Sequence, residues 1–166
     1  MGIFHNNDIQ VVMLDFQDII TDLFGSNVSH VHLSEDEKST VKKINGEVWV
    51  ADDSNSSRLI VSELLAKAEI EHKLFNNGKE LLESYNSGDS KSVVAIITDF
   101  EMPQLDGLEL SVRIKKMDPR MPILLLSSLV NSNVVDKSKE AGVDLCLEKD
   151  ELNSLIKNLI ELINKG

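Results

Sequence analysis

The chain has 166 residues, 42% of them hydrophobic, so it is long enough to bury one good core plus an appendage. Acidic residues number 28 against 17 Lys and Arg, and the net charge of −11 argues against a nucleic-acid partner. The chain has no apolar run that could cross a bilayer, no secretory signal in its first residues and only one cysteine, Cys146, so we expect a cytoplasmic protein without an internal disulfide or membrane insertion.

Residues 1–46 lack the pattern of a complete domain. A short strand is predicted over residues 9–14 and an amphipathic helix over residues 16–23, and the polar residues 26–46 are predicted to form a linker or a solvated helix. One strand and one helix cannot enclose a core, so this appendage is expected to dock on the rest of the chain, on a second copy or on another domain. His30 and His32 are interpreted as surface residues rather than metal ligands.

Residues 47–166 alternate predicted strands and helices. Alternation of this kind implies a parallel sheet with right-handed crossovers, and five such units are too few for an eight-fold barrel. The expected fold is therefore α/β, with a doubly wound five-stranded parallel sheet. Strands are predicted over residues 48–51, 71–75 (at an edge), 93–97, 123–126 and 143–147. Leu110, Ile114 and Met117 are predicted as the inner face of the third helix.

Polar residues stand where four of these strands end. Asp52 and Asp53 follow the first strand, Asp99 the third, Ser127 the fourth and Lys149 the fifth. Because parallel strands deliver their carboxyl ends to one edge, we expect these side chains to meet there. Singly, each has an ordinary explanation, such as a helix cap or a solvated charge. Together they indicate a functional site.

Three carboxylates at one edge repel one another. At about 4 Å, two unit charges cost roughly 4 kcal/mol at an effective dielectric near 20, so the cluster predicts a bound cation, a raised pKa, or both. Hard oxygen ligands favour Mg²⁺, whereas zinc would require His or Cys. Asp99, at the centre, is the candidate nucleophile, which would form an aspartyl phosphate.

Four sequence blocks together resemble the receiver domain of two-component response regulators. They are VADDS at residues 50–54, DFEMPQLDG at 99–107, PILLLSS at 122–128, and Ala141-Gly142 followed by Lys149. The resemblance spans residues 47–166 and implies the strand order 2-1-3-4-5. It also implies a signalling domain with no enzymatic activity beyond Mg²⁺-dependent self-phosphorylation and slow autodephosphorylation.

The same resemblance assigns roles by position. Asp99 would accept a phosphoryl group from a histidine kinase, and Lys149 would bind the phosphate. Ser127, followed by Ser128, would be the switch hydroxyl. The Mg²⁺ ligands would be Asp52, Asp53, Asp99 and the backbone carbonyl of Glu101.

Three positions depart from the receiver pattern. Asp150 replaces the usual proline after the lysine, and Cys146 replaces the usual aromatic residue of the last strand. Glu101, two residues after the phosphoacceptor, is acidic. The first two departures predict an altered output mechanism, and the third predicts an altered phosphate lifetime.

The segment VVMLDFQDII, residues 11–20, resembles the end of the coupling domain in CheV-type chemotaxis proteins, where a CheW-like domain precedes a receiver. This resemblance implies a partner in the chemoreceptor and kinase array. Alternatives are the receiver of a transcriptional or other response regulator, an aspartyl-phosphate phosphatase, and a pseudo-receiver that only binds. Phosphatases of the haloacid dehalogenase type require a second Asp where Glu101 stands.

Overall fold

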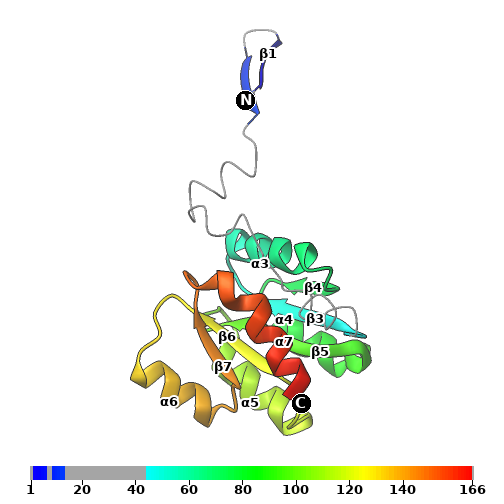
Figure 1. Cartoon of the computed structure of the whole chain (residues 1–166), viewed down its shortest axis with the longest axis vertical. Helices are drawn as coiled ribbons and strands as arrows, with labels where there is room; N and C mark the ends of the chain where they lie inside the picture. The colour runs from blue at the N-terminus through cyan, green and yellow to red at the C-terminus, as the bar shows by residue number, and fades with distance from the viewer. Residues whose placement is uncertain (1, 7–8, 14–43, 166) are drawn as a thin grey trace.

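The computed structural model describes residues 44–165, together with the backbone of residues 2–6 and 9–13 (Figure 1). Within the described part, no helix is long and apolar enough to span a membrane. The helix predicted over residues 16–23, His30 and His32 lie outside the described residues.

Two short strands precede the main domain. β1 (Gly2–Asn6) pairs with β2 (Ile9–Met13) in an antiparallel two-stranded sheet. β2 confirms the strand predicted over residues 9–14. β1 was not predicted, because glycine and asparagine, which stand at its two ends, are depleted in strands.

The main sheet has five parallel strands in the order β4-β3-β5-β6-β7. Numbered from the start of the domain, this is the order 2-1-3-4-5, as expected. β4 lies at an edge, and the neighbouring strands carry the apolar runs typical of strands that are buried on both faces. The strands are β3 (Glu47–Ala51), β4 (His72–Phe75), β5 (Val93–Asp99), β6 (Ile123–Ser127) and β7 (Leu145–Glu148).

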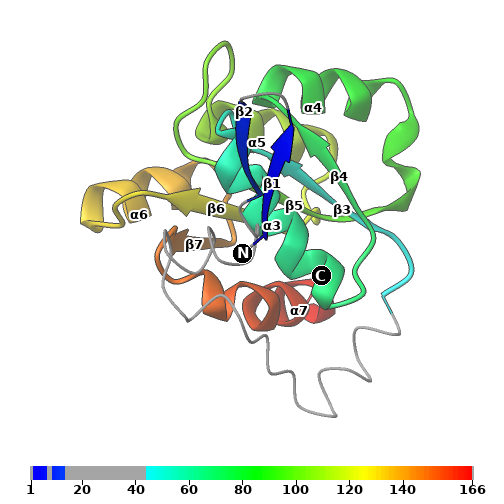
Figure 2. The same ribbon diagram turned by 90° about the horizontal axis from the view of Figure 1, so that it is seen from above.

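Helices cover both faces of the sheet (Figures 1 and 2). The apolar side chains of α3 and α7 pack with one face in one cluster, and those of α4 and α5 pack with the opposite face in a second. The α-helices are α3 (Asn55–Lys67), α4 (Gly78–Asn86), α5 (Gly107–Met117), α6 (Ser132–Glu140) and α7 (Leu155–Lys165). Short 3₁₀ turns, η2 (Asp89–Ser92) and η3 (Leu152–Ser154), precede β5 and α7.

The loop after β5 is held close to the sheet. Asp106 caps α5 by accepting a hydrogen bond from the amide of Glu109 at 2.7 Å. Gly107 packs so tightly that a Cβ there would lie 2.1 Å from the carbonyl oxygen of Asp99. Only glycine permits this approach, and the loop therefore stays beside the end of β5.

One predicted core position is wrong. Leu110 and Ile114 of α5 are fully buried, but Met117 is 47% exposed. Met117 is the last residue of α5, and the core next to this end of the helix is filled by Met121, which the chain brings back as it enters β6.

Candidate functional site

Three carboxylates meet at the carboxyl edge of the sheet, as the strand ends predicted. Asp52 follows β3 directly and is 1% exposed, and Asp99 ends β5 and is 6% exposed. Asp53 is exposed and lines the adjoining cavity. One oxygen from each of the three lies within 4.8 Å of the others, which is close enough for a shared cation.

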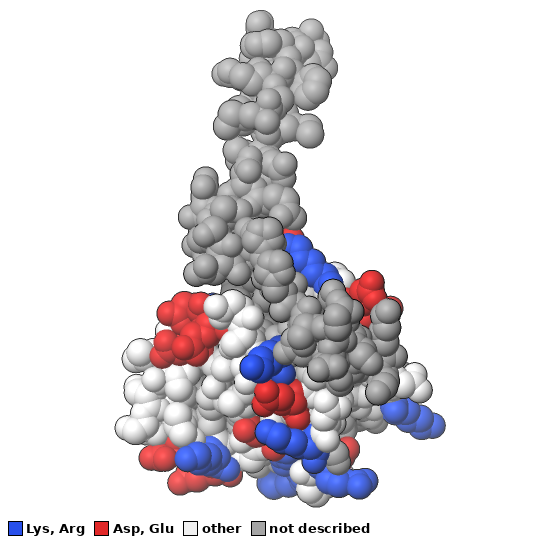
Figure 3. All heavy atoms as spheres, viewed as in Figure 1, with Lys and Arg blue, Asp and Glu red and all other residues white. Residues whose placement is uncertain are grey.

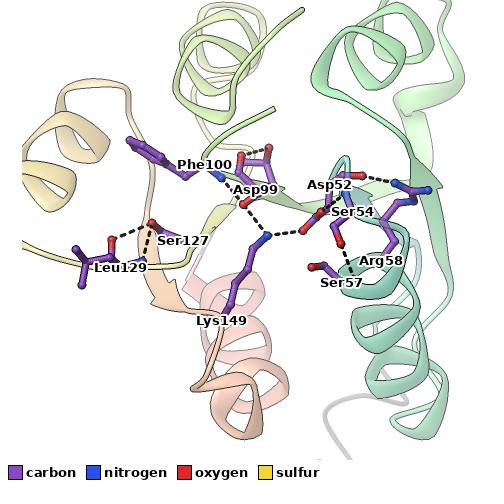
Figure 4. Close-up of polar contacts among 10 residues, drawn as sticks. Asp52, Ser54, Ser57, Arg58, Asp99, Phe100, Ser127, Leu129 and Lys149 are labelled. Carbon is purple, nitrogen blue, oxygen red and sulfur yellow. Dashed lines mark hydrogen bonds and ion pairs between the residues drawn. The ribbon is translucent and has the colours of Figure 1, made fainter. Parts of the chain in front are cut away.

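Lys149 bridges the two buried carboxylates (Figure 4). Its Nζ lies 2.9 Å from Asp52 Oδ2 and 2.9 Å from Asp99 Oδ1. The backbone amide of Lys149 donates to the carbonyl of Ser127 at 2.9 Å, so the lysine enters the site as a direct continuation of the β6–β7 ladder. The ammonium therefore offsets part of the repulsion that three adjacent carboxylates create.

Asp52 is anchored on both sides. Its Oδ1 accepts the amide of Ser54 at 2.7 Å, and its backbone carbonyl accepts a hydrogen bond from the Arg58 guanidinium of α3. These contacts fix the β3–α3 loop, from which Asp53 projects. Arg58 was missed by the sequence analysis. The signal for it was a basic residue in the first turns of α3, close after the acidic pair.

Asp99 has one engaged oxygen and one open oxygen. Oδ1 accepts the amide of Phe100 at 2.9 Å and also contacts Lys149, whereas no described residue donates a hydrogen bond to Oδ2. A carboxylate with one oxygen held and the other unpaired is oriented for attack on an electrophile.

The ionisation of this cluster is shifted by its surroundings. Burial raises the pKa of Asp99 to about 6, against 3.8 for an ordinary aspartate, and the charge of Asp52 adds to the rise while Lys149 opposes it. Burial lowers the pKa of Lys149, but its contacts with Asp52 and Asp99 outweigh burial and raise that pKa. Lys149 is therefore a permanent cation here.

Ser127 reaches the same edge, but its hydroxyl is directed away from Asp99 (Figure 4). Its Oγ donates to the carbonyl of Leu129 at 2.9 Å and accepts the amide of Leu129 at 3.3 Å. Ser127 is 5% exposed, whereas Ser128 is exposed. The hydroxyl that is expected to act as the switch therefore makes both of its hydrogen bonds within its own loop.

A cavity of 730 Å³ opens beside the carboxylates. It is lined on one side by the loop after β5, which includes Phe100, Glu101 and Met102, and on the other by the segment from Ser127 to Val134. No described residue donates a hydrogen bond to the carbonyl of Glu101. The cavity, which Asp53 and Asp99 also line, therefore offers space for a phosphoryl group beside two carboxylates.

The donor set fits a hard divalent cation. Asp52, Asp53 and Asp99 supply only oxygen ligands, and this group of described residues contains neither His nor Cys. Cys146, in the position predicted for the altered switch residue, is half-buried on β7 and packs against the α4 and α5 cluster. It takes no part in the carboxylate cluster.

A parallel sheet with buried carboxylates and a lysine at its carboxyl edge defines a doubly wound α/β domain with an acidic site, and comparison with known proteins identifies the family. The sequence pattern of the response regulator receiver domain matches residues 48–161. This chain belongs to the response regulator receiver domain family.

The relatives that match this chain include chemotaxis proteins and transcriptional regulators. Chemotaxis protein CheV1 of Helicobacter pylori is 30% identical over 161 residues, which cover 92% of this chain and 49% of CheV1. The DNA-binding transcriptional regulator NtrC of Escherichia coli is 31% identical over 119 residues, which cover 69% of this chain and 25% of NtrC. This chain therefore spans about half of one relative and about a quarter of the other.

A solved structure shares both fold and sequence pattern. The receiver domain of the histidine kinase CKI1 from Arabidopsis thaliana, complexed with Mg²⁺ and BeF₃⁻, matches with a TM-score of 0.61 and 28% identity. The match covers 77% of this chain and 96% of that domain.

Proposed function

We propose that this chain is a phosphorylation-controlled signalling domain in which Asp99 accepts a phosphoryl group from a histidine kinase. The observation that carries the proposal is the environment of Asp99, which is buried, is held through Oδ1 and has no hydrogen-bond donor to Oδ2 among residues 44–165. A bond would form between Oδ2 and phosphorus as the bond from phosphorus to the donor histidine nitrogen breaks.

The neighbouring groups would stabilise the transferred charge. Lys149 already contacts Asp99 and would remain beside the phosphoryl oxygens as a fixed cation. We propose Mg²⁺ as the cation held by Asp52, Asp53, Asp99 and the Glu101 carbonyl, where it would neutralise phosphoryl oxygens. The Mg²⁺ and BeF₃⁻ named for the CKI1 receiver support this choice. Ser127 would donate to the phosphoryl group once its hydroxyl leaves Leu129.

The biological setting we propose is chemotaxis, with protein partners in a receptor and kinase array. The match to CheV1 covers 92% of this chain, which extends beyond the receiver into the N-terminal residues, whereas the match to NtrC covers 69%. On the face drawn in Figure 3, Lys and Arg of the described residues are interspersed with Asp and Glu and form no continuous basic field. That distribution supports protein partners over nucleic acid.

Acetyl phosphate with Mg²⁺ tests the chemistry directly. We expect one hydroxylamine-sensitive phosphoryl group per chain by intact-mass measurement, and none in Asp99→Asn. Asp150→Asn, which also neutralises one acidic residue near Lys149 in the sequence, is the matched control and should be phosphorylated normally. Steady phosphate release would instead indicate a phosphatase, and no modification at all would indicate a binding module.

The metal requirement is tested with Asp53→Ala. Asp53 is exposed, so the free energy of unfolding without metal should change by less than about 0.5 kcal/mol. Phosphorylation should nevertheless lose its dependence on Mg²⁺ and become slow. Normal Mg²⁺-dependent phosphorylation of this variant would exclude Asp53 as a ligand.

A further inference from the structure

Glu148 forms a contact that the phosphorylation chemistry does not use. It is the last residue of β7 and immediately precedes Lys149. Its Oε1 accepts the backbone amide of Val130 at 2.8 Å, across 18 residues of sequence. Val130 lies in the loop between β6 and α6, so Glu148 joins this loop to the neighbouring strand.

The loop has a second attachment one residue earlier. Leu129 is bonded through both its amide and its carbonyl to the Ser127 hydroxyl, so the two attachments hold consecutive residues. Packing contributes little at this point, since the Leu129 side chain is 62% exposed. The conformation of the loop therefore depends on these polar contacts.

The position of Glu148 follows from the alternation of β7. Leu145 and Leu147 pack with the cluster on the α3 and α7 face, and Cys146 packs with the cluster on the opposite face. Glu148, two residues beyond Cys146, shares the face of Cys146. Lys149 then continues to the carboxylates, so consecutive residues of one chain segment contact the loop and the phosphoacceptor.

We propose that Glu148 is a positioning residue that holds the β6–α6 loop in the conformation in which the Ser127 hydroxyl is turned away from Asp99. Release of Ser127 from Leu129 requires the backbone at Leu129 and Val130 to rearrange, and the Glu148 contact opposes that rearrangement. A hydrogen bond to a charged acceptor is stronger than one between neutral groups, so this contact biases the loop toward the unphosphorylated conformation. The second step of this inference rests on the proposed function, while the loop attachment itself does not.

Three variants distinguish the effect of losing the hydrogen bond to Val130 from the effect of losing a negative charge. Glu148→Ala removes the acceptor, and Glu148→Gln keeps a neutral oxygen that can still accept from Val130. Glu140→Ala removes one negative charge from the exposed C-terminal residue of α6 and serves as the charge control. The first measurement is amide hydrogen exchange at Val130 in the unphosphorylated, metal-free protein. We expect exchange to be about tenfold or more faster in Glu148→Ala, up to about threefold faster in Glu148→Gln because its acceptor is neutral, and unchanged in Glu140→Ala.

The second measurement is the affinity for beryllofluoride in the presence of Mg²⁺. Glu148→Ala should bind about tenfold more tightly, the factor that corresponds to about 1.4 kcal/mol, and Glu148→Gln should stay within about threefold of the parent protein. Unchanged exchange at Val130 in Glu148→Ala would overturn the attachment. Faster exchange with unchanged or weaker beryllofluoride binding would overturn the restraint on Ser127. If the parent protein itself bound no beryllofluoride, the proposed function would fail, and the exchange measurement would still decide whether the attachment exists.

Discussion

Two halves of the carboxyl edge are built differently. At the centre, Asp52, Asp99 and Lys149 from three strands contact one another directly, and both carboxylates are almost fully buried. Beyond β6, the loop and α6 have few attachments, and α6 buries only Val134 and Ser138. The groups at the centre are therefore prearranged by direct contacts, whereas the segment next to them is weakly held and free to move at low energetic cost.

A buried polar group further weakens the packing of α6 against the rest of the domain. The Ser138 hydroxyl on α6 is buried and has no hydrogen-bond partner among the described residues. An unsatisfied buried hydroxyl costs about 1–3 kcal/mol. In α7, by contrast, the buried positions are all aliphatic. The two helices therefore differ in the side chains that they bury, which are all apolar in α7 and include an unpaired hydroxyl in α6.

The largest effect is expected from breaking the central half with Lys149→Met. Two buried carboxylates would lose their common partner, and removing one member of a buried ion pair costs about 3–5 kcal/mol. Urea unfolding at neutral pH without metal measures the loss, with Lys157→Met of α7 as the exposed control. A loss below about 1 kcal/mol would show that the bridge is not what holds the carboxylates together.

A smaller effect of opposite sign is expected from Asp99→Asn without metal. The native pKa of Asp99, about 6, lies above the value of 3.8 for an ordinary aspartate, so the folded state binds a proton more tightly than the unfolded state. The contribution of Asp99 to stability therefore falls as pH rises from about 4 to 6 and is constant above that range. Asp99→Asn should gain about 2–3 kcal/mol at pH 8 and almost nothing near pH 4.

Thermal or urea unfolding of this variant across pH 4–8 provides the measurement. Asp150→Asn, at an exposed position, should give no pH-dependent gain. An equal gain at pH 4 and pH 8 would mean that the effect does not come from the ionisation of Asp99.

In the weak half, Ser138→Ala is expected to stabilise the protein by about 1 kcal/mol, because it removes an unpaired buried hydroxyl and introduces a better helix former. Urea unfolding would detect this change. Ser132→Ala, at the exposed start of α6, should not stabilise. A destabilised Ser138→Ala would mean that the hydroxyl has a role in the native packing.

The smallest effect is expected from Cys146→Ala. The thiol is half-buried, and its truncation should cost no more than about 1 kcal/mol. Its small side chain cannot act as a lever between the site and the surface, so phosphorylation-dependent changes in amide exchange should persist. If Cys146→Ala were phosphorylated normally but no longer showed these exchange changes, Cys146 would be needed to couple phosphorylation to the conformational change.

The sequence predicted the sheet and the centre of the site well, because both follow from a strong local pattern. Runs such as that from Val93 to Ile97 are apolar on both faces, and a charged residue marks where the strand leaves the core. Parallel topology then brings the strand ends together, without further information. Asp52, Asp99 and Lys149 were found in this way.

What the sequence did not predict depends on side-chain geometry. Asp52 and Asp53 are adjacent in sequence, yet Asp52 is buried against Lys149 and Asp53 is exposed. The sequence alone does not show which of the two carboxylates is buried. The contact from Glu148 to Val130 joins a strand end to a loop amide and leaves no periodic signal. The hydrogen bond from the Ser127 hydroxyl to the Leu129 carbonyl could not be predicted either, because it depends on the local path of the backbone.

Amide hydrogen exchange with and without beryllofluoride and Mg²⁺ tests the contrast between the two halves most directly. We expect changes in protection to concentrate between Ser128 and Gly142, while amides in β3 and β5 keep their protection. Changes confined to the loop after Asp99, with none between Ser128 and Gly142, would contradict the account.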